Sequence, residues 1–263
     1  MADDLTSPGL TPVRDERTPT VIVDDLHIVY RVHGAGTGKG SATAALRRIV
    51  RRKTPSTMRE VHALRGVNLT AYRGDAIGLI GRNGSGKSTL LRAIAGLLPP
   101  ERGVVYTEGQ PALLGVNAAL MNDLTGERNV TLGCLAMGMS PDEVRERFDE
   151  IVDFAGVGDF ITMPMRTYSS GMSSRLRFAI AAAKSHDVLM IDEALATGDA
   201  EFRKKSEERI RELRAEAGTV FLVSHSLGVV TETCNRVIWL DKGRIRLDGP
   251  PKETVEAYVA ATS

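Results

Sequence analysis

A run of glycines followed by a lysine could hold the phosphate groups of a bound ligand. Residues 81–89 read Gly-Arg-Asn-Gly-Ser-Gly-Lys-Ser-Thr and follow the apolar run at residues 76–80. Glycines reach backbone conformations that a Cβ atom forbids, so that successive N–H groups can converge on an anion. The pattern Gly-x-x-x-x-Gly-Lys-Ser between a strand and a helix predicts a nucleoside triphosphate site. Its expected contacts are Gly81, Asn83, Gly84, Ser85, Gly86, Lys87, Ser88 and Thr89.

Two side chains of this loop have separate tasks in the predicted site. Lys87 is expected to reach the β- and γ-phosphates of ATP, and Ser88 to place its hydroxyl group on Mg²⁺. A helix over residues 88–96, ending at Gly96, would direct the positive end of its dipole at the same anion. The alternative is a glycine-rich turn that carries a lysine by chance. The order of apolar strand, loop and helix argues against that alternative.

Two carboxylates follow a second apolar run. Residues 188–191 read Val-Leu-Met-Ile and predict a buried strand, and Asp192 and Glu193 come directly after it. Asp192 is expected to hold Mg²⁺, directly or through water, and Glu193 to orient and deprotonate the water that attacks the γ-phosphate. A strand that runs into an acidic loop is common in isolation. Its pairing with the glycine-rich loop favours the catalytic interpretation.

A histidine follows the next expected strand, at residues 219–223. A lone histidine in such a place more often has a structural role. In a parallel sheet, however, the carboxyl ends of neighbouring strands open into one crevice. We therefore expect His225 to contact the γ-phosphate and to act in catalysis with Lys87 and Glu193.

A further segment predicts a second anion site. Residues 168–172 read Tyr-Ser-Ser-Gly-Met before an expected helix at 173–183, which places the Ser170 hydroxyl group and the Gly171 amide at a helix N-terminus. The segment resembles the signature loop of ATP-binding-cassette ATPases, whose usual form is Leu-Ser-Gly-Gly-Gln. The resemblance implies that this loop closes on the nucleotide of a second copy, giving a head-to-tail homodimer with two shared ATP sites. A simple Ser-Gly helix cap is the alternative.

The resemblance extends over about residues 20–260. Residues 124–129 read Leu-Thr-Gly-Glu-Arg-Asn, residues 192–202 read Asp-Glu-Ala-Leu-Ala-Thr-Gly-Asp-Ala-Glu-Phe, and a long insert precedes the glycine-rich loop. These segments resemble the ATPase subunits of polysaccharide exporters, above all the mycobacterial galactan exporters. The resemblance implies a dimer contact at Asp199 and a position on the cytoplasmic face of the inner membrane. It also implies ATP hydrolysis that drives lipid-linked O-antigen, teichoic acid or galactan through two copies of a membrane-spanning subunit.

Two nucleotide contacts are less regular than the family pattern. Cassette ATPases usually have a glutamine where the core meets the helical subdomain, whereas residues 113–120 contain none, and Asn117 is the expected substitute. Tyr30, at the end of the first expected strand, resembles the aromatic residue on which adenine stacks, the alternative being an ordinary strand tyrosine. A soluble cassette ATPase of DNA repair or translation is the alternative function. Such proteins typically carry a second cassette or a coiled-coil insert, and neither is visible here.

A basic segment lies within the expected insert at residues 40–54. Apolar residues recur there at helical spacing, and basic residues crowd the rest of the predicted helix between Arg47 and Lys53. We expect this helix to lie at an anionic membrane leaflet or to meet the pyrophosphate of a lipid-linked polysaccharide. The alternative is a helix packed on its own sheet with a solvated basic face. A nucleic-acid site is disfavoured because no aromatic residues interleave with the charge.

Composition agrees with one α/β domain that carries an inserted subdomain. The 263 residues are 42% hydrophobic and 25% charged, and can bury a full core. The net charge of +1 gives no global attraction to nucleic acid. Cys134 and Cys234 lack metal-ligand spacing and fit two reduced thiols rather than a disulfide. No apolar stretch approaches the roughly 20 residues of a membrane-spanning helix, so any passage through a membrane would come from another chain.

The expected fold class is α/β: a P-loop NTPase of the cassette type, with a mixed β-sheet core, an inserted α-helical subdomain and a small antiparallel β part. We divide the chain into a disordered leader (1–19), a nucleotide-binding core (20–124), an α-helical signature subdomain (125–185) and a continuation of the core (186–263). The remaining expected strands are 21–30, 67–71, 103–107, 111–114, 236–240 and 244–247, and the last two flank Asp-Lys-Gly at residues 241–243, a hairpin signal. The remaining helices are one capped by Ser140, 200–217 and 253–261. Because the sequence ends soon afterwards, we expect no additional β-rich glycan-binding domain.

Overall fold

The structure is a computed structural model that describes residues 17–33, 58–114, 120–192, 200–224 and 226–262. Several predictions lie outside the described residues: those for Glu193, Asp199, His225 and Asn117, for the basic segment from Arg47 to Lys53, and for residues 1–16 of the leader.

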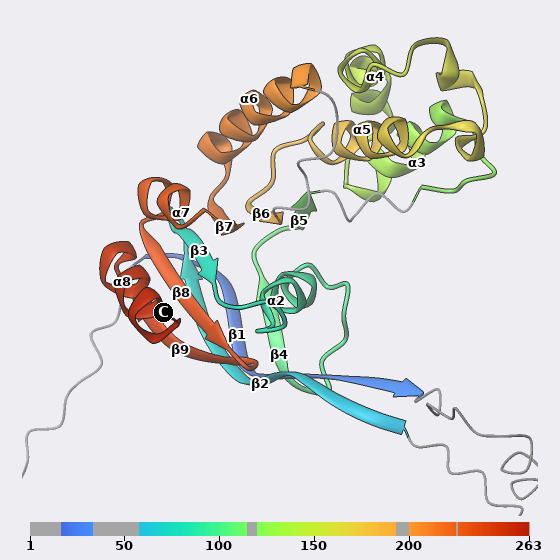
Figure 1. Cartoon of the computed structure of the whole chain (residues 1–263). Helices are drawn as coiled ribbons and strands as arrows, with labels where there is room; N and C mark the ends of the chain where they lie inside the picture. Colours follow the sequence, from blue (N-terminus) through green and yellow to red (C-terminus); the bar gives the residue numbers. More distant parts are fainter. Residues whose placement is uncertain (1–16, 34–57, 115–119, 193–199, 225, 263) are drawn as a thin grey trace, which may run out of the picture.

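The strands form two separate sheets (Figure 1). The antiparallel sheet has the order β2–β1–β4, and the second, six-stranded sheet has the order β5–β6–β7–β3–β8–β9. In the second sheet, the five neighbouring strands β5, β6, β7, β3 and β8 are parallel, and β9 runs antiparallel to β8. The strands are β1 (Pro19–His33), β2 (Met58–Tyr72), β3 (Ala76–Ile80), β4 (Arg102–Thr107), β5 (Pro111–Leu114), β6 (Val188–Asp192), β7 (Thr219–Val223), β8 (Arg236–Asp241) and β9 (Arg244–Gly249).

Helices cover both faces of the six-stranded sheet. On one face, α2 (Lys87–Ile94) lies between the two sheets, and its buried Leu90, Leu91 and Ile94 join one core with β1, β2 and β3. On the other face, α6 (Ala200–Glu216), α7 (Leu227–Thr233) and α8 (Pro251–Thr262) contribute to a second core. The expected α/β fold with a mixed sheet and an antiparallel part is confirmed.

A third core belongs to the helical subdomain, which lies at one end of the molecule in Figure 1. It contains α3 (Gly126–Ala136), α4 (Pro141–Ala155) and α5 (Ser170–Ala181), with the short 3₁₀ helices η1 (Gly158–Thr162) and η2 (Met165–Thr167) between α4 and α5. The predicted cap is present at α4. Ser140 Oγ accepts a hydrogen bond from Glu143 N, and Glu143 accepts one from Ser140 N, which satisfies two donors at the start of the helix.

Residues 124–129, Leu-Thr-Gly-Glu-Arg-Asn, hold the start of α3 in place. Asn129 is 2% exposed, and its amide group bonds the backbone of Met121, Leu124 and Thr125. A Cβ atom at Gly126 would come within 2.2 Å of the Tyr168 hydroxyl group. The segment therefore fixes the start of α3 closely against the chain that leads into α5.

Both cysteines are buried free thiols, in agreement with the expectation of reduced cysteines. Burial raises the pKa of Cys134 to about 11, and burial also raises the pKa of Cys234. Both thiols therefore stay protonated at neutral pH, which makes them poor nucleophiles.

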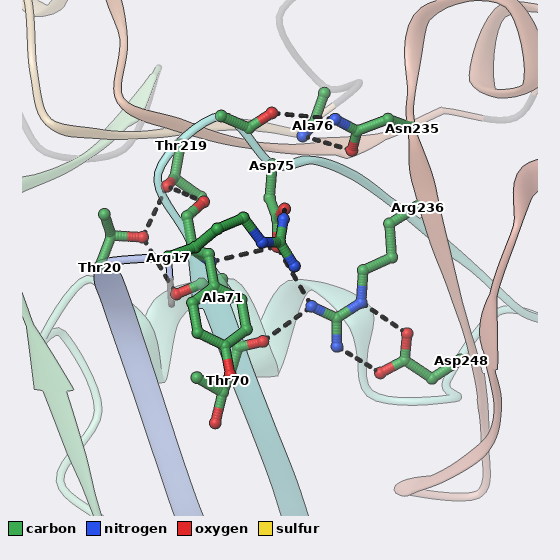
Figure 2. A network of polar contacts seen from close by, with 12 residues as sticks. Arg17, Thr20, Thr70, Ala71, Asp75, Ala76, Thr219, Asn235, Arg236 and Asp248 are labelled. Atoms are coloured by element: carbon green, nitrogen blue, oxygen red, sulfur yellow. Dashed lines mark hydrogen bonds and ion pairs between the residues drawn. The ribbon is translucent and has the colours of Figure 1, made fainter. Parts of the chain in front are cut away.

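A buried carboxylate joins the two sheets (Figure 2). The side chain of Asp75, which precedes β3, is 3% exposed and pairs with Arg17 at 2.7 Å and Arg236 at 3.2 Å. Arg236 also bonds Asp248 through two nitrogen atoms and donates to the carbonyl group of Thr70 on β2. Hydrogen bonding to Asp248 is the main cause that raises the pKa of Arg236. One ion cluster thus connects β2, β3, β8 and β9.

Neutral hydrogen bonds extend this junction. The Thr20 and Thr219 hydroxyl oxygens are 2.6 Å apart, and Thr219 Oγ1 donates to the carbonyl group of Tyr72. The Asn235 side chain accepts from Ala76 N and donates to the Gly74 carbonyl group (Figure 2). Thr219 thus pairs the start of β7 with β1 and β2 of the other sheet, as buried polar groups require, and Asn235 joins the starts of β3 and β8 within the six-stranded sheet.

The first two strands are longer than the sequence predicted. β1 begins at Pro19, inside the predicted leader, and β2 begins at Met58 rather than at residue 67. The two strands pair from Pro19–Tyr72 to His33–Met58, with several register shifts. Backbone pairing with the neighbouring strand therefore extends β2 through a stretch whose side chains are mostly exposed, where the apolar pattern is weak.

We expect Asp75→Asn to lower the free energy of unfolding by about 3 kcal/mol, because Arg236, whose side chain is 24% exposed, loses the buried carboxylate that it pairs with. Urea unfolding measures this loss. The control is Glu60→Gln, which removes an exposed partner of Arg31 and should cost less than about 1 kcal/mol. Equal losses for the two variants would show that Asp75 does not hold the junction.

Candidate nucleotide site

A cavity of about 310 Å³ opens where the phosphate loop meets the carboxyl ends of β6 and β7. Asp192 and Val223 face one another in the parallel register of these strands. The cavity is lined by Asn83, Gly84, Ser85, Gly86, Lys87, Ser88, Thr89, Asp192 and Val223. The structure thus brings the predicted loop contacts and the first predicted carboxylate together. Gly81 lies at the base of the loop rather than in the cavity wall.

Two glycines of the loop are required by their surroundings. Gly81 has φ +144°, and a Cβ atom there would lie 2.2 Å from the carbonyl oxygen of Leu240. Gly86 has φ +111°, and its Cβ atom would lie 2.9 Å from the carbonyl oxygen of Ala63. Side chains at both positions would therefore push the loop away from β8 and β2.

The turn between β8 and β9 supports the loop from behind. Gly243 N donates to the Ser85 carbonyl group at 2.9 Å, and Arg65 N of β2 donates to the Gly243 carbonyl group at 2.8 Å. A Cβ atom at Gly243 would lie 2.5 Å from the carbonyl oxygen of Ala63. The sequence predicted the turn but not this contact, because nothing local links Gly243 to a loop so far upstream.

The start of α2 suits an anion. The N-cap residue Gly86 offers no side-chain cap, and the first turn contains no acidic residue, so that the helix dipole is uncompensated by the protein. Lys87 Nζ donates to the carbonyl groups of Gly81 at 2.7 Å and Arg82 at 3.2 Å, which holds its charge at the loop.

A buried hydroxyl group gives a direct test of whether a phosphate ligand fits. Ser85 is 4% exposed and lines the cavity, and its Oγ atom has no hydrogen-bond partner within the described part of the chain. An unpaired buried hydroxyl group is costly, and a phosphate oxygen would satisfy it. The loop therefore fits the triphosphate that its sequence predicts.

The cavity also contains oxygen donors that suit Mg²⁺. The Ser88 hydroxyl group and the Asp192 carboxylate belong to the same wall, and both are hard oxygen ligands. Among the residues that the structure describes, no three His, Cys, Asp or Glu side chains form a metal cluster. This donor set suits a cation that takes further ligands from water and phosphate.

The second predicted anion site lies away from this cavity. α5 begins at Ser170 rather than at residue 173, because Ser169 caps it and accepts a hydrogen bond from Met172 N at 3.1 Å. Ser170 is exposed, and only Ser169 Oγ, at 3.8 Å, would meet a Cβ atom at Gly171. Gly171 has no steric reason to be glycine within the described part of one protomer.

Tyr30 lies in β1, opposite Val61 of β2, and packs partly against the core between the sheets. It is not among the described residues that line the cavity, so that adenine stacking stays a prediction. Glu193 and His225 follow directly on Asp192 and Ser224, respectively, outside the described residues. Their roles also remain predictions.

This arrangement of loop, strands and helical subdomain has counterparts in known proteins. The sequence profile of the ABC transporter family matches residues 64–196, about half of the chain. The chain therefore belongs to the ABC transporter family.

Within this family, the chain is similar to ATP-binding proteins of export systems. The chain is 44% identical over 204 residues to the O-antigen export system ATP-binding protein RfbB of Myxococcus xanthus, which covers 77% of this chain and 47% of that protein. It is 42% identical over 201 residues to the teichoic acids export ATP-binding protein TagH of Listeria innocua, covering 76% of this chain and 60% of TagH. The chain thus spans about half of the length of these relatives.

Solved structures support the fold. A structure described as the ATP-binding subunit of an ABC transporter superposes with a TM-score of 0.66 at 23% identity, covering 93% of this chain and all of that one. The dimeric ATP-binding cassette MJ0796 with ADP and phosphate gives a TM-score of 0.63 at 22% identity, covering 88% of this chain and 98% of that one.

We expect Lys87→Ala to weaken ATP binding at least tenfold, because the phosphate charge loses a charge-assisted hydrogen bond. Equilibrium dialysis of the full chain measures the affinity. The control is Lys252→Ala, an exposed lysine on α8 that should leave the affinity unchanged. Parental affinity in Lys87→Ala would refute the assignment of this lysine to the phosphates.

Proposed function

We propose that the chain is the ATP-hydrolysing subunit of an ABC exporter that moves a lipid-linked polysaccharide across the inner membrane. The observation that carries the proposal is the 40–44% identity to ATP-binding proteins of O-antigen and teichoic acid export over about three quarters of the chain. This similarity favours a transport ATPase over the soluble repair or translation type. Lipid-linked galactan is the cargo that the sequence resemblance favours.

In this proposal the residues of the cavity divide the work on ATP. The loop amides, the Ser85 hydroxyl group and Lys87 bind the phosphates, while Ser88 and Asp192 hold Mg²⁺. When bound, Mg²⁺ would neutralise charge on the phosphate oxygens. Glu193 orients and deprotonates the attacking water.

Other proposed contacts complete the nucleotide site. His225 contacts the γ-phosphate, Tyr30 stacks on adenine, and Asn117 takes the place of the usual glutamine. These roles rest on the sequence pattern and on the carboxyl-end position of the neighbouring Ser224.

We propose that two copies close head to tail on two ATP molecules, with Ser170, Gly171 and Asp199 facing the nucleotide of the partner. The exposed position of Ser170 and the free space around Gly171 support this arrangement. Among the described residues, only Ser169 Oγ lies within 4 Å of a Cβ atom built at Gly171, which leaves room for a second subunit at this helix start. The relative MJ0796 is described as dimeric in two structures.

We propose that the protein lies at the cytoplasmic face of the membrane, where it binds two copies of a membrane-spanning subunit. None of the helices in the described ranges is long and apolar enough to span a bilayer. The export names of the relatives support a membrane partner. The predicted basic helix from Arg47 to Lys53 would meet the lipid pyrophosphate of the cargo.

The dimer prediction uses a variant that slows hydrolysis. Glu193→Gln should keep ATP binding, nearly abolish turnover and trap a dimer, because the amide keeps the shape but cannot accept the proton. Adding Gly171→Asp should prevent this dimer, because a carboxylate would face the partner's γ-phosphate in a dry interface. Light scattering with ATP measures the dimer.

Gly228→Asp in the Glu193→Gln background is the control, since Gly228 likewise has an open surrounding but lies on α7. It should leave the dimer intact. ATP-induced dimers in the Gly171→Asp double variant would show that α5 does not face the nucleotide. If the ATP turnover of Glu193→Gln stays within a few-fold of the parental rate, Glu193 is not the catalytic base.

The cargo prediction concerns the basic segment. Replacing Arg47, Arg48, Arg51 and Arg52 with glutamine removes charge and keeps helix propensity, so that polysaccharide export should fall while basal ATPase activity is kept. The variant is expressed in cells that lack the parental gene, and the amount of labelled polysaccharide at the cell surface measures export. Parental export in this variant would contradict a role for these arginines in cargo binding.

A further inference from the structure

A second cavity, of about 460 Å³, lies between α6, α7 and the carboxyl ends of β6 and β7. Its size is within the range of pockets that bind small molecules. It shares two wall residues, Asp192 and Val223, with the cavity of the phosphate loop. The two cavities are therefore adjacent and have the Asp192 carboxylate in common.

Part of the wall of this cavity is apolar. Ile191 of β6 and Leu222 of β7 are 5% and 8% exposed, respectively, and both line it. Ile210 of α6 and Val229 of α7 form the sides, and Val229 is 43% exposed. This wall suits a hydrocarbon body, because contact there removes apolar surface from water.

A buried hydroxyl group in the wall has no hydrogen-bond partner among the described residues. Ser206 on α6 is 6% exposed and lines the cavity, and its Oγ atom has no hydrogen-bond partner in the described ranges. A serine inside a helix can usually bond the carbonyl group four residues earlier. An unsatisfied hydroxyl group is costly, so that its presence points to a ligand that bonds it.

The charges around the cavity favour an anion. Arg203, Glu207 and Arg211 line it at intervals of four residues on α6, so that each arginine neighbours the one glutamate of this row. Arg214 adds a third guanidinium group, held by a 3.1 Å hydrogen bond to the carbonyl group of Thr233 on α7. Glu207 offsets only one of these three arginines. Asp192, the other carboxylate of the wall, also faces the phosphate-loop cavity.

We propose that this cavity binds a small amphipathic carboxylate, with its hydrocarbon body on the apolar wall and its head group bonded by Ser206 and the arginines of α6. Because this cavity shares Asp192 with the nucleotide cavity, binding of the ligand changes the affinity of the protein for ATP. Binding of ATP changes the affinity for the ligand by the same factor. This inference does not depend on the exported cargo.

Decanoate, used below its micelle concentration, is the probe for the full chain. Calorimetric titration should show saturable binding of one molecule, and decyltrimethylammonium should not bind because its charge is reversed. Arg203→Gln combined with Arg211→Gln should weaken decanoate binding at least tenfold, since hydrogen bonds to charged groups are lost. Arg244→Gln, an exposed arginine on β9, is the matched control.

Two further variants separate a ligand contact from a structural role. Val229→Trp should fill the mouth of the cavity and abolish decanoate binding while ATP still binds. Ser206→Ala should weaken decanoate binding about fivefold and yet raise the thermal midpoint of the free protein, because an unsatisfied hydroxyl group is removed.

Four results would overturn the proposal. They are the absence of saturable decanoate binding, equal binding of the cationic probe, unchanged decanoate affinity in Val229→Trp, and a lower thermal midpoint with unchanged decanoate affinity in Ser206→Ala. The link to the nucleotide cavity has its own readout. Equal ATP affinity with and without saturating decanoate would contradict it, whatever the outcome of the export experiment.

Discussion

Behind the phosphate loop, three backbone segments approach one another closely at positions where glycines leave no side chain between them. Gly81 and Gly86 of the loop adjoin the carbonyl groups of Leu240 and Ala63, respectively, and Gly243 also adjoins the carbonyl group of Ala63. Hydrogen bonds from Gly243 N to the loop and from β2 to Gly243 close the arrangement. The shape of the loop is therefore set by β2 and by the turn of a hairpin, as well as by its own glycines.

The rest of the structure keeps these segments in place. The ion cluster around Asp75 and Arg236 holds β2, β3, β8 and β9 together, and these are the strands that support or lead into the loop. Packing of α2 between the sheets fixes the helix whose N-terminus completes the site. In the helical subdomain, Asn129 fixes the start of α3, and Gly126 lets this helix approach Tyr168, which precedes α5, so that the predicted dimer surface depends on a separate local network.

The sequence predicted what local chemistry determines. The glycine-rich loop, the carboxylate at the end of β6, the capping box of α4 and the hairpin turn that contains Gly243 all follow from neighbouring residues. It missed features that depend on distant partners: the length of β2, which pairing with β1 determines, and the support of the loop by Ala63 and Gly243. The buried hydroxyl group of Ser206 also has no local signal, because its surroundings come from three other elements.

The most direct test of this account compares ATP affinity in Gly243→Ala and Gly74→Ala, measured by equilibrium dialysis on protein shown to be folded. Both glycines have positive φ, +78° and +91°, so that both variants carry similar backbone strain. Only at Gly243 would a Cβ atom meet a neighbour, the Ala63 carbonyl oxygen at 2.5 Å, whereas nothing lies within 4 Å at Gly74. The account predicts at least tenfold weaker ATP binding, about 1.4 kcal/mol, in Gly243→Ala alone. Parental affinity in both variants would contradict the claim that the hairpin turn shapes the phosphate loop.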